Sequence, residues 1–387
     1  MSAGGSVRKV PNGTWTFVVD LPGGTGGRRQ VRRRGFPSRR EAQTALTLLL
    51  ASVQQGSFVK RDRLTVEAYL SQWMEGLPTS GRSVSTVSSY GHNLRLHVVP
   101  YVGGLALQDL APQDLDRLYQ RLTTSGRRNG GSSGLALRTV RYVHTILSVA
   151  LSDAVKKGVL ARNPAKAATP PSAKSSRAPE MEWWRPEELA TFLDQTAAHE
   201  LGLVFRLAGV TGMRRGELLG LRWSDVDLAA AVLTVRRQLA STDYQVRFDE
   251  PKTERGRRRI DIDPGTVTAL AAARREVLSL RAQTGRDDPV FVREDGRSWH
   301  PETLSRTFDR LILGAGLPRI RFHDLRHTHV AHLISANVDA LTISRRLGHA
   351  SVAFTLDRYG HLFDQAGADA AQAVVRLLGP SPSMNDC

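Results

Sequence analysis

The sequence predicts a multidomain α+β protein, with a small N-terminal sheet and helix, an all-helical middle domain and a mixed, mainly helical C-terminal domain. Its 387 residues exceed what one typical domain needs. Two stretches, Gln55–Arg63 and Thr169–Glu180, have the composition of linkers. Between them apolar residues recur at helical spacing, whereas strand-like runs are found in the flanking segments. The expected domains are therefore residues 1–57, 64–168 and 182–378.

The first domain is predicted to be a small sheet backed by one helix. The run Thr14–Asp20 is rich in β-branched and aromatic residues and ends in a glycine-rich turn, and a basic strand, Arg28–Arg34, follows it. Ser38 precedes Glu41 by three residues, which is the spacing of a helical capping box. The apolar face of the helix that follows is predicted to comprise Leu46, Leu49, Leu50 and Val53.

Positive charge is concentrated in this first segment. The chain has a net charge of +17, and residues 1–63 hold twelve Lys or Arg against three Asp or Glu, a net +9. Such an excess indicates a polyanionic partner, because neutralising phosphates releases counterions. A β-ribbon can enter a DNA groove, so the basic strand is predicted to bind DNA. A solvated strand edge that resists aggregation is the alternative. The arginines concerned are Arg28, Arg29, Arg32, Arg33 and Arg34.

The middle domain is predicted to be helical from Leu64 to about Pro164. Its apolar residues form stripes at helical spacing, which most simply make a helical core. These stripes include Tyr69, Leu70 and Trp73, then Val87, Tyr90 and Leu94, and later Val140, Val143, Ile146 and Leu147. His92 and Arg95 on one of these helices are expected to have no chemical role.

The C-terminal domain is predicted to combine helices with short strands. Pro186 suits the first turn of a helix at 186–198, and a second helix is expected at 201–210. Strands are expected near 231–238 and 244–249, then a basic strand at 257–262 and further helices.

Four short segments of this domain carry side chains suited to binding and cleaving a phosphodiester. In Thr211–Leu218, Arg214 lies in a turn that opens a helix, where a guanidinium beside free helix N–H groups can bind phosphate. His323 and Arg326 are three residues apart and therefore share one helix face. Each motif is weak when it is taken singly. The whole set, in chain order, is Arg214, Lys252, His323, Arg326, His349 and Tyr359.

Four histidines between His323 and His332 raise the alternative of a metal site. No carboxylate or cysteine completes a usual ligand set at a suitable spacing, and the single cysteine, Cys387, is the last residue. One cysteine also allows no disulfide within the chain. The sequence therefore predicts neither a metal nor a cofactor.

In this order and spacing the six residues resemble the signature of the tyrosine recombinase, or phage integrase, family. The matching stretches are Thr211–Leu218, His323–Thr328, Leu347–His349 and Thr355–His361. The middle domain resembles the core-binding domain of that family, and the N-terminal segment resembles the arm-binding domain of its phage-type members. The resemblance implies a three-stranded sheet plus helix for arm-type DNA, an all-α domain for core DNA and a mixed, mainly α catalytic domain.

The resemblance also implies how the reaction proceeds. Tyr359 is the expected nucleophile, and its attack leaves a 3′-phosphotyrosine and a free 5′-hydroxyl. Arg214 and Arg326 are expected to hold the two non-bridging oxygens of the scissile phosphate. Positive donors of this kind stabilise the pentacoordinate transition state, and arginine forks with imidazoles can do so without a metal.

The remaining residues are expected to move protons and complete the pocket. By the same resemblance, His323 and His349 assist by hydrogen bonding and proton transfer, and Lys252 protonates the departing 5′ oxygen. A tyrosine hydroxyl has an ordinary pKa of about 10, so it needs a cationic pocket and a proton acceptor to attack near neutral pH.

The predicted function is that of an integrase for a phage or mobile element. Its expected partners are duplex attachment sites of core and arm type and three further copies of the chain in a tetramer on DNA. A host DNA-bending protein and an excisionase are further candidates. No apolar run is long enough to span a membrane, and the expected location is the cytoplasm of a bacterial host, at the nucleoid.

Two alternatives remain open on the sequence. A type IB topoisomerase shares the tyrosine chemistry but lacks a basic N-terminal arm. A non-catalytic DNA-binding regulator leaves Tyr359 and its ordered partners unexplained.

Overall fold

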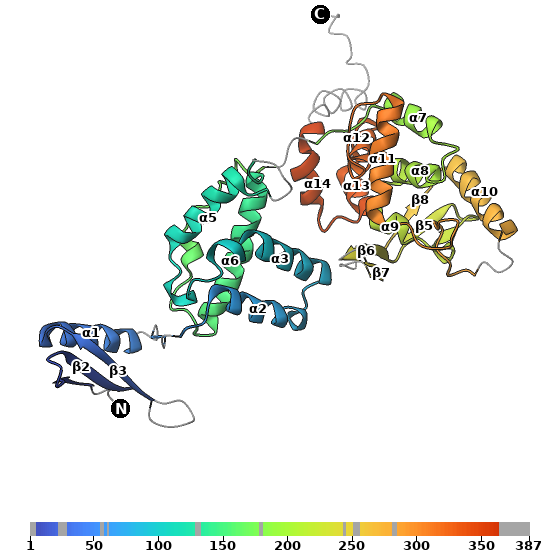
Figure 1. Cartoon of the computed structure of the whole chain (residues 1–387). Coiled ribbons are helices and arrows are strands. Elements are labelled where there is room, and N and C mark those ends of the chain that lie inside the picture. The colour runs from blue at the N-terminus through green and yellow to red at the C-terminus, as the bar shows by residue number, and fades with distance from the viewer. Residues whose placement is uncertain are drawn as a thin grey trace, which may run out of the picture. The chain divides into compact units, whose positions relative to one another are not determined.

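The computed structural model divides the chain into two compact units, Met1–Ala178 and Pro179–Cys387 (Figure 1). It describes residues 5–21, 29–54, 58–59, 62–127, 133–177, 181–242, 245–250, 256–280 and 285–363. None of the helices in these ranges is long and apolar enough to cross a membrane.

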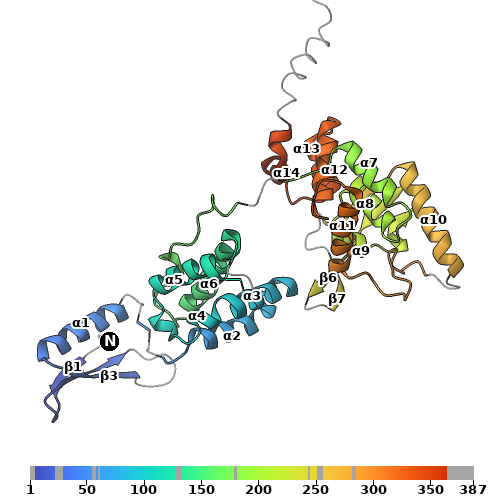
Figure 2. The same cartoon turned by 45° about the horizontal axis from the view of Figure 1, so that its top comes forward.

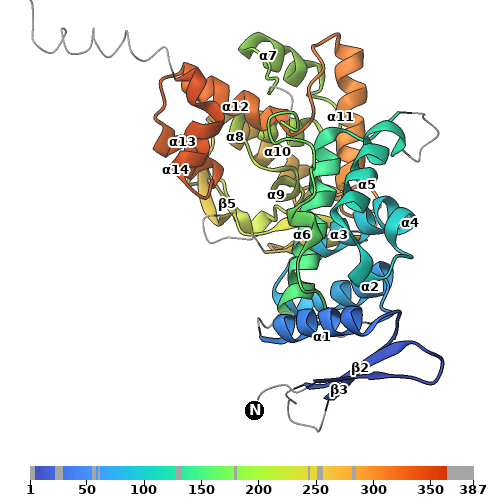
Figure 3. The same cartoon turned by 90° about the vertical axis from the view of Figure 1, so that its left-hand side faces the viewer.

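The N-terminal part is a three-stranded antiparallel sheet with one helix, as predicted. Its strands are β1 (Gly5–Lys9), β2 (Trp15–Leu21) and β3 (Arg29–Phe36), in the order β1-β2-β3. Helix α1 (Arg39–Gln54) lies along one face of the sheet (Figures 1 and 3). The amide of Glu41 donates to the Ser38 hydroxyl at 3.2 Å, which confirms the predicted helix start.

A small core joins this sheet to its helix. Alternation along β2 buries Phe17 and Val19, which pack against Leu46 and Leu49 of α1. The first strand, β1, has no aromatic or long β-branched run, so sequence patterning did not reveal its position. It pairs with β2 from Gly5 opposite Val19 to Lys9 opposite Trp15.

The rest of the first unit is a helical bundle. Its helices are α2 (Val66–Gly76), α3 (Val84–His97), α4 (Val99–Val102), α5 (Pro112–Ser125) and α6 (Leu137–Lys156), with short 3-10 turns at Pro78–Ser80, Leu107–Asp109 and Pro164–Lys166. Thr65 caps α2 and Ser83 caps α3, each through its side-chain oxygen. The predicted stripes form one core, in which Trp73 stacks on Tyr90.

The second unit is mainly helical with two small sheets. Its helices are α7 (Pro186–Gln195), α8 (Gly202–Thr211), α9 (Arg215–Leu219), α10 (Pro264–Leu280), α11 (Pro301–Ala315), α12 (Asp324–Ser335), α13 (Ala340–Leu347) and α14 (Val352–Tyr359), with 3-10 turns at Trp223–Asp225 and Gly360–Leu362. Strands β4 (Val226–Asp227), β5 (Val232–Val235) and β8 (Arg258–Asp261) form one antiparallel sheet. Strands β6 (Gln238–Thr242) and β7 (Gln245–Asp249) form a separate pair (Figures 1 and 2).

Two element boundaries differ from the sequence-based prediction. The single strand expected at 231–238 is divided between β5 and β6. Successive side chains of a strand point to opposite faces, but those of Arg236 and Arg237 both face the buried carboxylate of Asp225, so the strand is interrupted there. The helix expected at 186–198 ends at Gln195, where the hydroxyl of Thr196 donates to the carbonyl of Phe192. Neither difference moves a candidate site residue.

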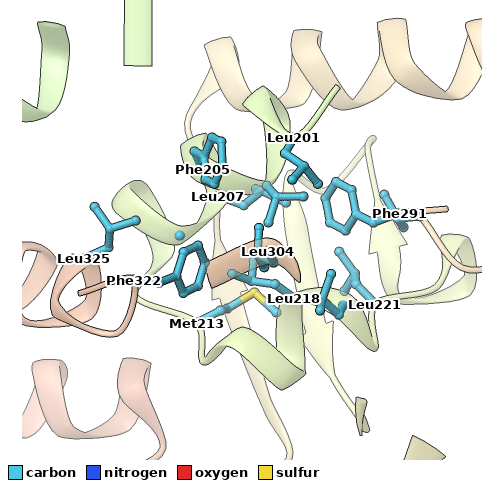
Figure 4. Packing of buried hydrophobic residues seen from close by; sticks show 14 of the residues in the cluster. Leu201, Phe205, Leu207, Met213, Leu218, Leu221, Phe291, Leu304, Phe322 and Leu325 are labelled. Carbon is cyan, nitrogen blue, oxygen red and sulfur yellow. The ribbon is translucent and has the colours of Figure 1, made fainter. Parts of the chain in front are cut away.

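The core of the second unit fixes the segments that carry the site. Met213 and Leu218 flank the first arginine segment, and both are buried in this core (Figure 4). Phe322 and Leu325 belong to the same core and lie on either side of His323 along the chain. Site residues therefore alternate with core residues, so packing limits their movement.

Candidate active site

Arg214 lies in the turn between α8 and α9. Gly212 ends α8 in the left-handed conformation with φ of 62°, and Arg214 is the N-cap residue of α9. A Cβ on Gly212 would lie 2.7 Å from a ring carbon of His329, so this sharp turn requires glycine. The amide and one guanidinium nitrogen of Arg214 each donate to the carboxylate of Glu217 at 2.8 Å.

Glu217 is a buried carboxylate shared by two arginines. Arg258, on β8, donates to its two oxygens at 3.0 and 2.8 Å, and Arg214 approaches it from the exposed side. Burial alone would raise the pKa of Glu217. The hydrogen bonds and charge of Arg258, together with the charge of Arg214, outweigh burial and lower that pKa to about 2. Glu217 is therefore ionised at neutral pH and fixes Arg214.

Arg326 is held by two backbone carbonyls. It is 4% exposed, and its terminal nitrogens donate to the oxygens of Gly212 at 2.7 Å and Leu347 at 2.8 Å. Burial and the nearby charge of Arg214 lower its pKa to about 9, so it stays positively charged at neutral pH. These two hydrogen bonds, which clamp the guanidinium, connect the ends of α8 and α13 to α12. The N–H groups of Arg326 that do not bond to these carbonyls can bind a phosphate oxygen.

The two predicted histidines are uncharged at neutral pH. Burial, followed by the charge of Arg326, lowers the pKa of His349 to about 3, and its Nδ1 is 2.8 Å from the Thr355 hydroxyl. His323 reaches solvent at the start of α12. The protein packed around its ring and the charge of Arg326 lower its pKa below the usual value. Both rings can therefore donate or accept one hydrogen bond in their neutral form.

Tyr359 is the last residue of α14 and is 2% exposed. Its hydroxyl oxygen lies 2.5 Å from Nδ1 of His327, which is on α12. Burial raises its pKa, although the charges of Arg326 and Arg358 act in the opposite direction. The hydroxyl is therefore protonated at neutral pH, and the contact with His327 holds it in place.

Five of the six predicted residues meet at one place in the second unit. The charges of Arg214 and Arg326 act on His323 and His349, and the charge of Arg326 also acts on Tyr359. Lys252 lies outside the described residues. Within the ranges that the structure describes, no group of three or more His, Cys, Asp and Glu is arranged to hold a metal ion.

The arginines predicted to bind DNA lie on the N-terminal sheet. Arg32, Arg33 and Arg34 are exposed on β3, where Arg33 pairs with Phe17 and Arg32 with Val18 of β2. The backbone of Arg29 belongs to β3, but its side chain and all of Arg28 lie outside the described residues.

Comparison with known proteins identifies the family. Residues 183–366 match the phage integrase family, and residues 6–53 match an arm DNA-binding domain. The C-terminal domain of the chain, which carries these residues, therefore belongs to the phage integrase family. This integrase is a tyrosine recombinase, as the residue pattern predicted, and neither alternative is favoured by the matches.

Relatives extend over nearly the whole integrase. The ICEBs1 integrase of Bacillus subtilis (strain 168) is 28% identical over 388 residues, which cover 96% of this chain and 100% of that protein. A tyrosine recombinase XerC-like protein of Caldanaerobacter subterraneus subsp. tengcongensis is 24% identical over 391 residues, covering 95% and 98%. The Tn1549 transposon integrase, solved in complex with transposon right end DNA, has the same fold with a TM-score of 0.66. It is 20% identical and covers 79% of this chain and 99% of that one.

Sequence reasoning missed three residues that shape the integrase site. Glu217 follows Arg214 by three residues, a capping-box spacing that could have revealed the contact. Arg258 pairs with Glu217 from 41 residues away, and no local pattern predicts that contact. The sequence suggests His327 only as one of the histidines of the metal alternative, yet its ring contacts the Tyr359 hydroxyl.

Proposed function

We propose that this integrase cleaves and rejoins two specific duplex DNA sites through a covalent 3′-phosphotyrosine bond at Tyr359. The observation that carries the proposal is the burial of the Tyr359 hydroxyl beside the clamped guanidinium of Arg326. A buried hydroxyl with a fixed arginine next to it suits attack on a phosphodiester, because the developing charge is neutralised where it forms.

Arg214 and Arg326 bind the non-bridging oxygens of the scissile phosphate in this proposal. Arg326 has fixed geometry because two carbonyls hold it, and Arg214 has fixed geometry because Glu217 holds it. Neither side chain must reorganise when the phosphate arrives, which is what makes such donors effective in a transition state. His323 and His349, both neutral, add hydrogen bonds to the phosphate.

Cleavage breaks the bond between phosphorus and the 5′ oxygen. The Tyr359 oxygen bonds to phosphorus, the 5′ oxygen leaves, and Lys252 gives it a proton. In rejoining, a 5′-hydroxyl attacks the phosphotyrosine and returns the proton in the opposite direction. The ester conserves the bond energy, so the exchange needs neither ATP nor a metal.

Three parts of the chain share the binding of DNA in this proposal. Residues 1–57 bind arm-type sites through β3, on which the side chains of Arg32, Arg33 and Arg34 are all exposed. Residues 64–168 and 182–378 bind the core site around the cleavage point. Exchange between two duplexes needs four cleavages and hence four copies of Tyr359, so the active assembly is a homotetramer on DNA.

The biological role that we propose is integration and excision of a phage or mobile element in the cytoplasm of a bacterial host, at the nucleoid. Bringing arm and core sites together requires bent DNA, which a host bending protein would supply. An excisionase would set the direction of the reaction.

A nicked suicide substrate tests the central claim. Wild-type protein should accumulate a protein–DNA adduct that survives denaturation, because the cut strand diffuses away and cannot be rejoined. Tyr359→Phe removes one oxygen and should abolish the adduct while site binding, measured by gel shift, stays near wild type. An adduct formed by the Phe variant would show that another residue is the nucleophile.

A further inference from the structure

His327 is a buried titratable residue to which the roles above assign nothing. It is 5% exposed, and its Nδ1 is 2.5 Å from the hydroxyl oxygen of Tyr359. On the other side of the ring, Nε2 has no hydrogen-bond partner among the described residues. The nearest carboxylate oxygen to Nε2 is that of Asp324, at 3.9 Å.

We propose that His327 accepts the proton of Tyr359 during cleavage, with Asp324 stabilising the imidazolium that results. The inference rests on the proposed function, in which Tyr359 is the nucleophile. The Tyr359 O–H bond breaks as the oxygen–phosphorus bond forms, and the proton moves to Nδ1 of His327. The electron pair of the broken P–O bond stays with the 5′ oxygen. In rejoining, the departing Tyr359 oxygen takes the proton back from His327.

The proposed role requires one particular tautomer of His327. When the Tyr359 hydroxyl donates to Nδ1, the proton of a neutral His327 must be on Nε2. That nitrogen faces Asp324, which is itself buried and held by three hydrogen bonds from Arg321, at 2.8, 2.9 and 2.7 Å. Once His327 is protonated, its new charge faces a fixed carboxylate. At 3.9 Å the carboxylate acts on the ring through its charge and not through a hydrogen bond, and a neighbouring negative charge stabilises the protonated form of a histidine.

The surroundings of His327 keep its ring uncharged before the reaction begins, so Nδ1 is free of a positive charge when the phosphate arrives. Burial, followed by the charge on His323, lowers its pKa to about 4, so the ring is neutral at physiological pH. Burial raises the pKa of Tyr359, so the proton remains on the tyrosine until the oxygen begins to bond to phosphorus. The titratable or charged groups that face His327 are Asp324, His323 and Arg321 near its own helix, Tyr359 and Arg358 on α14, and His349 before α14.

The other two histidines are less well placed for this step. Nδ1 of His349 is 2.8 Å from the Thr355 hydroxyl, and no hydrogen bond joins either His349 or His323 to Tyr359 within the described residues. Both remain available to the phosphate oxygens. The division of labour is therefore one histidine for the nucleophile and two for the phosphate.

His327→Asn tests the inference, because the Asn amide oxygen can accept a hydrogen bond near the position of Nδ1 but cannot take up the proton. The rate of adduct formation on the nicked substrate should fall by about a hundredfold or more. In wild type that rate should be nearly flat from about pH 6 to about pH 8. In the variant it should rise by roughly tenfold per pH unit, because solvent hydroxide must then remove the proton.

A lower phenol pKa should compensate for the missing base. Replacing Tyr359 with difluorotyrosine in the His327→Asn background should recover a large part of the lost rate, and should change the wild-type rate much less. His332→Asn is the matched control on the same helix, because His332 donates to the Trp184 carbonyl at 2.9 Å and does not contact Tyr359. It should cleave at nearly the wild-type rate.

Two results would overturn the inference. One is a His327→Asn rate within about threefold of wild type. The other is a slow variant whose pH profile stays flat and which difluorotyrosine does not rescue, since that pattern would mean that His327 only positions the ring. DNA binding measured in parallel separates loss of folding from loss of rate. If Tyr359→Phe still forms the adduct, the proposed function itself fails. If that variant is inactive while His327→Asn is normal, only the role of His327 fails.

Discussion

Glu217 accepts two hydrogen bonds from Arg258, at 3.0 and 2.8 Å, in an ion pair whose two side chains are each 5% exposed. The same carboxylate accepts a bond from Arg214, so one acid links β8 to the arginine at the start of α9. Removing one member of such a pair leaves a buried charge without its partner, which is far more costly than losing a surface pair.

Glu217→Gln should therefore lower the free energy of unfolding of this unit by about 3 kcal/mol. It should also slow adduct formation, because Arg214 loses its charged anchor. Hydrogen-exchange protection of α9 and β8 measures the stability of this unit separately from the other domains. Glu302→Gln is the matched control: Glu302 pairs with Arg215 at 3.9 Å on the surface, and its loss should change stability by less than about 0.5 kcal/mol.

The ion pair between Glu217 and Arg258 also predicts how the stability difference between wild type and Glu217→Gln depends on pH. The folded-state pKa of Glu217 is about 2, against 4.5 in the unfolded chain, so its contribution is complete above 4.5. That contribution disappears as the pH falls from 4.5 toward 2, because the unfolded chain then takes up a proton that the folded protein does not. The difference between wild type and Glu217→Gln should shrink over this range. A difference that stays constant down to about pH 3 would contradict the assignment.

Arg214 and Arg326 should contribute more to the rate than to DNA affinity. The chain has 54 Lys and Arg, so many other basic residues are available to bind the DNA backbone, whereas loss of a transition-state donor costs on the order of a hundredfold or more in rate. Arg214→Lys keeps the charge but loses the planar fork, so it should be nearly as slow as Arg214→Ala. Single-turnover cleavage of pre-bound substrate separates the two effects. Reduced affinity with normal cleavage in the bound fraction would refute the proposed roles.

The two arginines should differ in their effect on stability. Arg326→Ala leaves the carbonyls of Gly212 and Leu347 without donors in a buried place, so it should lower the free energy of unfolding by about 2 kcal/mol or more. Arg214 is partly exposed, and Arg214→Ala should have a smaller effect.

Cleavage should persist in excess EDTA, because the proposed chemistry uses only side chains of this chain. The measurement is adduct formation by purified protein with and without the chelator, followed by addition of zinc. Complete loss that zinc reverses would revive the metal alternative for the histidines from His323 to His332.

The residue pattern predicted the family and five residues that meet at one site, because those residues lie in short local segments with fixed spacing. Local spacing also located the start of α1 at Ser38. It could not locate the partners of these residues. Arg258 reaches Glu217, and Arg326 reaches Gly212, only once the chain has folded, and such contacts leave no periodic trace in the sequence. The role of His327 was hidden for the same reason, since its partner, Tyr359, lies 32 residues away.

The two ends of the chain should bind different DNA sequences. The N-terminal sheet carries exposed arginines on β3 and has its own small core, so it should fold and bind arm-type sites without help from the rest. A truncated protein that begins at Leu64 should therefore still bind and cleave a short core site. It should integrate poorly on substrates that carry the full flanking sequences. Arg33→Ala combined with Arg34→Ala in the full chain should have the same effect with no truncation.

Footprinting distinguishes specific arm binding from a general electrostatic tether. Full-length protein should protect outlying sequences that the truncated protein leaves open, and this protection should persist when a non-specific competitor is added. A tether would give the same footprint for both proteins. Its contribution would disappear steeply with salt, since non-specific binding depends on the release of counterions from the phosphates. Equal footprints and equal integration yields would therefore refute arm-site recognition by β3. The N-terminal segment would then contribute to DNA binding only through the net charge of +9 in residues 1–63.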